Sequence, residues 1–220
     1  MVENYDRMEG EVEVPQFLLE ERESYVPEFA NEKSQEAEKS VSGVNPGALR
    51  GTAFHRVMEC LDFVKLLDYD TTNPKALWKY LSEEIERMLD KKLLTEEMEQ
   101  LIYRNSIIDF LQSPVALRMA KAAKRGDLYS EKPFVMDYEG VLVQGIIDVF
   151  WLEDGKIVLM DYKTDSVSEP EELLTRYATQ LRLYGQALGS VFGGGEGVKK
   201  ETENLIYSFA LGTTIPVTEN

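Results

Sequence analysis

Three side chains in the middle of the sequence have the types and spacing to bind a divalent cation with an ammonium group beside it. Asp148 lies in the apolar run Gly145–Trp151, and Asp161 directly follows a second apolar run. Lys163 comes two residues after Asp161, so on a β-strand the two side chains share a face while Tyr162 points away. Burying carboxylates without a partner is costly. Their setting therefore favours a functional site over a solvated sheet face.

The positions of these carboxylates depend on two predicted turns. Three segments are typical of strands: Leu128–Tyr138, Val141–Leu152 and Lys156–Lys163. If Asp154-Gly155 is a two-residue hairpin turn, Asp148 lies directly opposite Asp161. If the weaker Glu139-Gly140 signal is also such a turn, Glu131 lies opposite Asp148.

A row of three carboxylates would bring together groups that repel one another. Directly opposed Cβ atoms in a sheet are about 4.5–5.5 Å apart. Carboxylates at that spacing need a proton or a cation between them. Because oxygen ligands favour Mg²⁺ or Mn²⁺ over zinc, the sequence predicts one of these ions at Asp148 and Asp161.

Predicted helices supply further candidates. His55, the only histidine, lies at the edge of an apolar helical stripe, where spacing alone allows a structural residue or a metal ligand. Gln180 and Tyr184 are four residues apart and share a helix face, which is compatible with packing or with function. For these three residues, spacing leaves both interpretations open.

The elements that must position these residues change in character along the chain. Apolar periodicity predicts a helical layer over roughly residues 51–125, with starts at Thr52, Asn73-Pro74, Thr95 and Ser113-Pro114. After the three strands, a helix is predicted to run from near Ser168 to about Gly189, followed by a final strand at 204–211. This order predicts an α/β domain around a mixed central sheet, with an N-terminal helical layer and flanking helices.

Composition limits the alternatives. The 220 residues carry a formal charge of −16, which argues against attraction of nucleic acid or anionic lipid to the whole surface. A single cysteine, Cys60, excludes an internal disulfide and a four-cysteine cluster, and favours a reducing, cytoplasmic setting. No segment approaches the length of a membrane span, so no membrane is expected. Residues 1–48 read as a docking arm or as a solvated linker, and 49–220 as the domain.

Five short motifs occur in the order found in the nuclease domains of the RecB and AddA helicase-nucleases, within the PD-(D/E)XK superfamily. The motifs are Gly51–His55, Glu131–Phe134, Gly145–Asp148, Asp161–Thr164 and Gln180–Tyr184. The resemblance covers roughly residues 14–217, and Pro15-Gln-Phe17 is similar to the segment that links helicase to nuclease. It implies a restriction-endonuclease-like core.

The resemblance also implies roles. His55, Asp148 and Asp161 become side-chain metal ligands, with the main-chain carbonyl of Tyr162 as a fourth ligand. Glu131 matches a position near the metal rather than a ligand. Lys163 becomes the catalytic lysine, and Gln180 and Tyr184 the motif that orients this lysine and the DNA backbone. AddB relatives hold an iron–sulfur cluster with four cysteines, so one cysteine favours the AddA branch and no cluster.

The implied activity is Mg²⁺- or Mn²⁺-dependent hydrolysis of DNA, as an exonuclease that cuts one strand of an unwound duplex end during recombinational repair. No P-loop occurs in the sequence, so ATP would be used only by an upstream helicase region that is missing here. The expected partners are those helicase domains and an AddB-type subunit. Two alternatives stay open: a nuclease-fold interaction module without activity, and a stand-alone exonuclease of the same superfamily.

Overall fold

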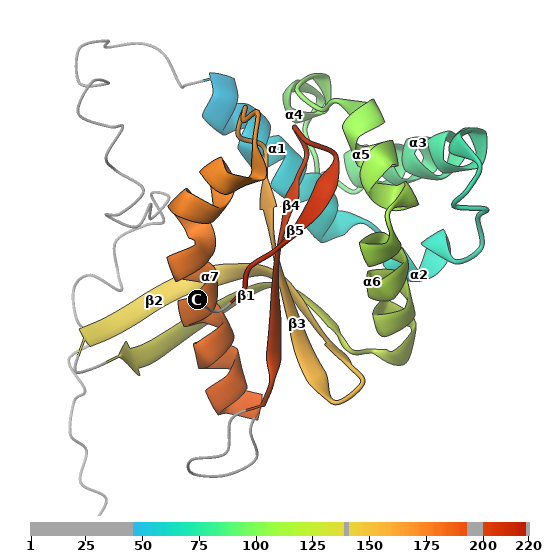
Figure 1. The fold of residues 1–220 in the computed structure, drawn as a ribbon. Helices are drawn as coiled ribbons and strands as arrows, with labels where there is room; N and C mark the ends of the chain where they lie inside the picture. Colours follow the sequence, from blue (N-terminus) through green and yellow to red (C-terminus); the bar gives the residue numbers. More distant parts are fainter. Residues whose placement is uncertain (1–45, 139–140, 193–199, 219–220) are drawn as a thin grey trace, which may run out of the picture. The chain divides into compact units, whose positions relative to one another are not determined.

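A computed structural model describes residues 46–138, 141–192 and 200–218. Within these residues a five-stranded sheet has the order β1-β2-β3-β4-β5 (Figure 1). Only the β3–β4 pair of that sheet is parallel, so the sheet is mixed, as the sequence predicts. The strands are β1 (Leu128–Tyr138), β2 (Val141–Glu153), β3 (Lys156–Lys163), β4 (Thr202–Ser208) and β5 (Thr213–Pro216).

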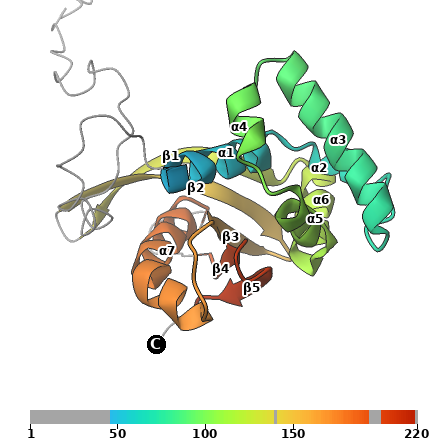
Figure 2. The same ribbon diagram turned by 90° about the horizontal axis from the view of Figure 1, so that it is seen from above.

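Helices cover both faces of the sheet. One face carries the helical layer, and α7 (Pro170–Phe192) packs on the other, as the turned view shows (Figure 2). The helical layer consists of α1 (Pro46–Cys60), α2 (Phe63–Leu66), α3 (Pro74–Asp90), α4 (Glu96–Gln100), α5 (Arg104–Gln112) and α6 (Pro114–Arg125). The predicted arm lies outside the described residues up to residue 45, as do Glu139 and Gly140 of the first predicted turn.

Side-chain caps explain where several helices begin. The Asn73 side chain accepts a hydrogen bond from the Lys75 N–H at 3.0 Å, and Pro74 takes the first helical position of α3. Thr95 and Ser113 cap α4 and α6 in the same way. These three predicted starts are confirmed.

Three predictions about element boundaries are wrong. Thr52 does not begin a helix: α1 begins at Pro46, and the Thr52 hydroxyl donates to the Ala48 carbonyl one turn back at 3.1 Å. The helix expected from Thr95 is split, because the chain turns after Gln100 while Ile102 stays buried, and apolar periodicity does not register such a break. The last strand, predicted over 204–211, already ends at Ser208 as β4, and the sequence analysis did not predict β5, which follows a turn that includes Gly212 at φ +62°.

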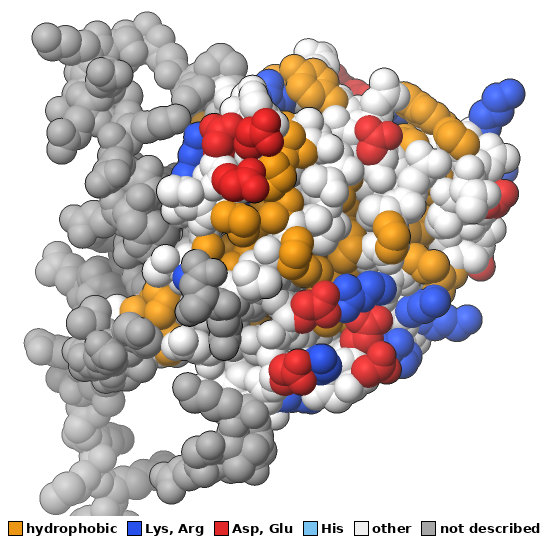
Figure 3. All heavy atoms as spheres, in the orientation of Figure 1, with side chains coloured by type: hydrophobic (Ala, Val, Ile, Leu, Met, Phe, Trp, Pro, Cys, Tyr) orange, Lys and Arg blue, Asp and Glu red, His pale blue; other side chains and the backbone are white. Residues whose placement is uncertain are grey.

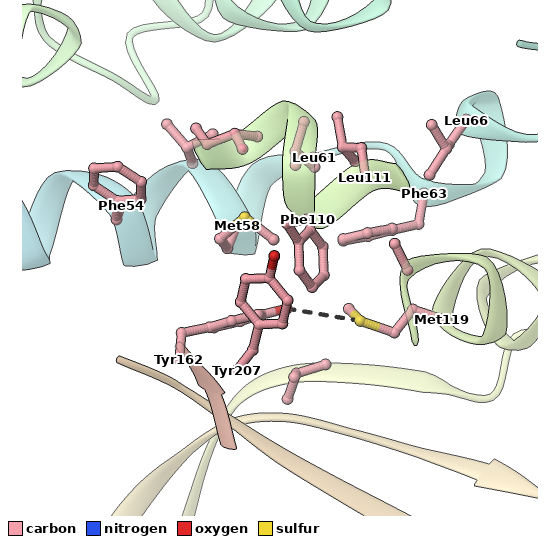
Figure 4. Packing of buried hydrophobic residues seen from close by; sticks show 14 of the residues in the cluster. Phe54, Met58, Leu61, Phe63, Leu66, Phe110, Leu111, Met119, Tyr162 and Tyr207 are labelled. Carbon is pink, nitrogen blue, oxygen red and sulfur yellow. Dashed lines mark hydrogen bonds between the residues drawn. The ribbon is translucent and has the colours of Figure 1, made fainter. Parts of the chain in front are cut away.

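The core between sheet and helices is apolar and aromatic. Tyr162 and Tyr207 reach from β3 and β4 toward Phe110 of α5, and the Tyr162 hydroxyl donates to the Met119 sulfur at 3.8 Å (Figure 4). The Tyr162 side chain is 3% exposed, so it points into the helical layer as predicted. Its neighbours Asp161 and Lys163 therefore lie on the other face of β3.

Candidate active site

The candidate site forms where β2 and β3 separate. These strands pair from Glu153↔Lys156 to Val149↔Met160, which is the predicted register. The ladder ends there, so Asp148 and Asp161 are the first residues beyond it. β3 remains paired with β4 as far as Lys163. In the opening, a carboxylate oxygen of Asp148 accepts a hydrogen bond from the Tyr162 N–H at 2.9 Å. The two aspartates therefore lie at the end of the shared ladder rather than within it.

Helix α1 brings His55 to this opening. Its neighbours Phe54 and Met58 are buried in the core and fix that face of the helix. The His55 Nε2 lies 3.1 Å from the Tyr162 carbonyl oxygen, and its Nδ1 lies 3.4 Å from a carboxylate oxygen of Asp148. His55 thus contacts two of the other predicted ligand groups, Asp148 and the Tyr162 carbonyl.

Glu131 approaches from β1. The predicted register holds on both sides of it, with Ser130 opposite Val149 and Lys132 opposite Ile147. Glu131 itself leaves the ladder and has a φ of +49°, an unusual backbone conformation for a glutamate. Potential ligand atoms of His55, Glu131 and Asp148 lie within 4.8 Å of one another, so Glu131 lies beside two of the predicted ligands.

Asp161 and Lys163 form the opposite side of the site. The Lys163 ammonium lies 2.5 Å from a carboxylate oxygen of Asp161, which is 4% exposed. Asp161 is not part of the group that meets within 4.8 Å. The Lys163 ammonium also lies 4.1 Å from the ring centroid of Tyr177 on α7.

Gln180 and Tyr184 lie on the same helix as Tyr177. The Gln180 side-chain amide donates to the Tyr184 hydroxyl at 2.7 Å, so their shared helix face is confirmed. The Tyr184 ring packs against Phe134 with centroids 4.7 Å apart, and its hydroxyl lies over Gly145, where a Cβ would approach it to 2.7 Å. The contacts that the structure gives for Lys163 are with Asp161 and Tyr177 rather than with this pair.

The sequence analysis missed Tyr177. It precedes Gln180 by three residues and Tyr184 by seven, a spacing that places all three on one face of a helix. That spacing was the available signal.

Burial and neighbouring charges shift the pKa values at the site. Burial raises the pKa of Asp161 to about 6, because the Lys163 ammonium offsets only part of the desolvation and of the repulsion from Asp148. Burial, with repulsion from Asp148, raises the pKa of Glu131 to about 7. Burial alone would lower the pKa of His55, but attraction to Asp148 outweighs it and raises the value to about 9. Despite its burial, Asp148 has a lowered pKa because His55 and Lys163 stabilise its charge.

These shifts describe a site with an excess of acidic groups. Two of its three carboxyl groups have raised pKa values, and the negative charge of the third, Asp148, raises the pKa of His55. A divalent cation relieves such crowding, and carboxylate, carbonyl and imidazole donors suit Mg²⁺ or Mn²⁺. The donor set therefore fits the predicted ion.

A comparison with protein-family models identifies the fold that carries this site. Residues 16–213 match the model described as PD-(D/E)XK nuclease superfamily. The chain belongs to this superfamily. The restriction-endonuclease-like core predicted from the five motifs is thereby confirmed.

Curated relatives extend the comparison. The AddA subunit of the ATP-dependent helicase/nuclease from Clostridium acetobutylicum is 33% identical over 183 residues, which cover 76% of this chain and 14% of the relative. The corresponding protein of Anoxybacillus flavithermus is 35% identical over 179 residues (77% and 13%), and that of Lachnoclostridium phytofermentans 30% over 242 residues (89% and 16%). The chain thus spans about a seventh of the length of these relatives.

A comparison with solved structures gives a weak match. The crystal structure of a protein named SSO0001 has 12% identity and a TM-score of 0.30, with 87% of this chain and 76% of that chain covered. This likeness is too weak to support an argument. Among the residues that the structure describes, no helix is both long enough and apolar enough to cross a bilayer.

Proposed function

We propose that this chain is the nuclease domain of an ATP-dependent helicase-nuclease, and that it hydrolyses DNA phosphodiester bonds with Mg²⁺ or Mn²⁺. One observation carries the proposal: donor atoms of His55, Glu131 and Asp148 meet within 4.8 Å, at the end of the strand that carries Asp161 and Lys163. Membership of the PD-(D/E)XK superfamily makes nucleic-acid cleavage the chemistry to which this geometry is suited.

Each residue has a definable part in that reaction. His55, Asp148, Asp161 and the Tyr162 carbonyl would hold the cation, with Glu131 beside it. The bound cation would polarise the phosphate and lower the pKa of a coordinated water. Lys163 would orient the attacking water and stabilise the charge that develops on the phosphate.

The remaining site residues would orient the catalytic lysine and the DNA backbone. Asp161 holds the Lys163 ammonium at 2.5 Å, so it would fix the lysine as well as contribute to the metal site. Gln180 and Tyr184, joined by their hydrogen bond, would orient the DNA backbone at the edge of the site.

Surface charge supports a domain that receives DNA from elsewhere. On the face shown in Figure 3, basic side chains of the lower part lie next to acidic ones. Among the described ion pairs, Arg118 is paired with Glu153 and Glu203, and Lys156 with Glu201, so nearby carboxylates offset these cations. With a formal charge of −16, the chain would bind DNA weakly by itself.

We therefore place the activity within a longer protein. Helicase domains upstream, driven by ATP, would unwind a duplex end and deliver one strand to this domain, which would act as an exonuclease in recombinational repair. The names of the relatives support this placement. The partner would be an AddB-type subunit, in the cytoplasm, where the single free cysteine Cys60 stays reduced.

A cleavage assay tests the proposal. The chain is incubated with end-labelled single-stranded DNA and Mg²⁺ or Mn²⁺, beside an Asp161→Asn variant and a chelator control. Cleavage should require the metal and should be lost in the variant. Equal rates in the two proteins would assign the activity to something other than this site. The assay is repeated in the full-length protein with its partner, where absence of Asp161-dependent cleavage would refute the proposal.

A further inference from the structure

The catalytic lysine of the proposed nuclease is contacted by an aromatic ring that its motif series does not include. The Lys163 ammonium lies 4.1 Å from the ring centroid of Tyr177 and 2.5 Å from a carboxylate oxygen of Asp161. Gln180 and Tyr184, the pair expected to orient the lysine, bond to each other instead. On α7, Tyr177 is the residue whose contact with Lys163 the structure shows.

The Tyr177 ring is itself fixed in place. Its hydroxyl donates to a carboxylate oxygen of Asp165 at 3.0 Å, and the Arg176 guanidinium contacts the same oxygen at 3.3 Å. Asp165 lies two residues beyond the end of β3, so this contact joins α7 to the segment that follows Lys163. The ring is thus held at the strand end from which the lysine projects.

A lysine side chain has four rotatable bonds and needs more than one contact to hold its ammonium in place. Asp161 provides one contact, but the resemblance also assigns that carboxylate to the metal. An aromatic face attracts a cation without using a carboxylate oxygen that the metal needs. The attraction is stronger where water is excluded. The Lys163 side chain is 16% exposed, which meets that condition.

We propose that Tyr177 is a positioning residue whose ring helps to hold the Lys163 ammonium in place, so that Asp161 would not be its only contact when this carboxylate also holds the cation. The inference rests on the proposed nuclease function, but its geometry can be tested without activity. The ring is the acting group, and besides the hydroxyl bond to Asp165 it packs against the apolar cluster that includes Leu173 and Ile206, which would hold a phenylalanine ring as well. Tyr177→Phe should therefore retain the effect, and Tyr177→Leu should lose it.

Nuclear magnetic resonance of the metal-free chain tests the geometry. Lysine labelled with ¹³C at Cε is incorporated biosynthetically, and Lys163→Arg assigns the Lys163 signal. Ring current from Tyr177 should move the Lys163 Hε resonances upfield of those of exposed lysines. The shift should persist in Tyr177→Phe and disappear in Tyr177→Leu. Tyr103→Leu, which removes a ring over Arg50 instead, serves as the control and should leave the signal unchanged. An unshifted Lys163 signal in the unmodified chain would overturn the inference.

Cleavage kinetics test the consequence. Tyr177→Leu should lower kcat/KM about tenfold, equal to about 1.4 kcal/mol, through kcat with little change in KM. Tyr177→Phe should stay close to the unmodified chain, and thermal melting confirms that both variants fold. Unchanged kcat in Tyr177→Leu, with the ring-current shift lost, would overturn the positioning role. Failure of the proposed function is distinguishable, since every variant would then lack cleavage while the Lys163 shift still depended on Tyr177.

Discussion

The two faces of β3 differ in what they do. On one face Tyr162 is buried with Phe110 and Met119 in an aromatic and apolar core (Figure 4). On the other face, at the end of the same strand, Asp161 and Lys163 lie among further ionisable groups. Neighbouring residues of one strand thus serve two opposite environments.

The difference shows how stability and chemistry are divided in this domain. The core fixes α1, β2 and β3 relative to one another, and through them His55, Asp148 and Asp161. The charged end of the strand does not stabilise the fold in this way. Burial raises the pKa values of Asp161 and Glu131 because it disfavours their charged forms. The core therefore supports a site that would be unfavourable alone, and substitutions on the two faces should have separable effects.

The largest effect is expected on the core face. Phe110 is fully buried and contacts the rings of Phe63, Tyr162 and Tyr207. Phe110→Ala should lower the free energy of unfolding by about 3–5 kcal/mol, as measured by urea denaturation. The control is Val191→Ala on α7, at a side chain that is 77% exposed, which should change stability by no more than about 0.5 kcal/mol. Similar losses in both variants would contradict the description of the core.

The opposite pattern is expected at Asp161. Asp161→Asn should lower the cleavage rate by roughly 10²–10³-fold, the scale seen when one preorganised electrostatic group is removed. Its unfolding free energy should change by no more than about 1 kcal/mol, since the substitution removes repulsion from Asp148 as well as the pairing with Lys163. Urea denaturation and rate measurements on the same preparation check both. A core-sized loss of stability would mean that the charged face also holds the fold together.

His55 contacts Asp148 and the Tyr162 carbonyl, so its substitution should affect metal binding more than folding. His55→Gln should weaken Mn²⁺ binding by at least about 10–100-fold, the range found for loss of even an outer partner of a metal site. Isothermal titration calorimetry measures this affinity. Glu59→Gln, one turn along α1 and paired with Arg56 at 2.6 Å, is the matched control and should weaken binding much less. Equal losses would point to a general charge effect instead of ligation.

The smallest effect concerns the contact between β2 and α7. A Cβ at Gly145 would lie 2.7 Å from the Tyr184 hydroxyl and 2.9 Å from the Phe134 ring. Gly145→Ala should therefore displace Tyr184, break its hydrogen bond with Gln180, and cost about 1–2 kcal/mol of stability. A thermal melt and a crystal structure of the variant check this. An undisturbed Tyr184 would show that β2 and α7 leave more room at Gly145 than the structure indicates.

Local signals in the sequence determined much of the fold. Asp154-Gly155 correctly set the β2–β3 register, and Asn73, Thr95 and Ser113 marked real helix starts. The prediction that Thr52 begins a helix was wrong because a threonine hydroxyl can either cap a helix or bond one turn back within it. Only the tertiary structure decides between these two positions.

Which candidate residues share a strand or a helix face was predictable, but the contacts between them were less so. Strand alternation placed Asp148, Asp161 and Lys163, but it could not show that β2 separates from β3 just before Asp148. Nor could it show the backbone conformation of Glu131, which brings this residue close to His55 and Asp148. The contact between Tyr177 and Lys163 depends on how α7 docks against the sheet, a long-range feature that spacing does not encode.

A crystal of the chain soaked in Mn²⁺ and measured at a wavelength that reveals manganese by anomalous scattering tests the central claim most directly. The account predicts one anomalous peak in contact with His55, Asp148 and Asp161, together with the Tyr162 carbonyl. A peak elsewhere, or none between the two aspartates at saturating Mn²⁺, would contradict it.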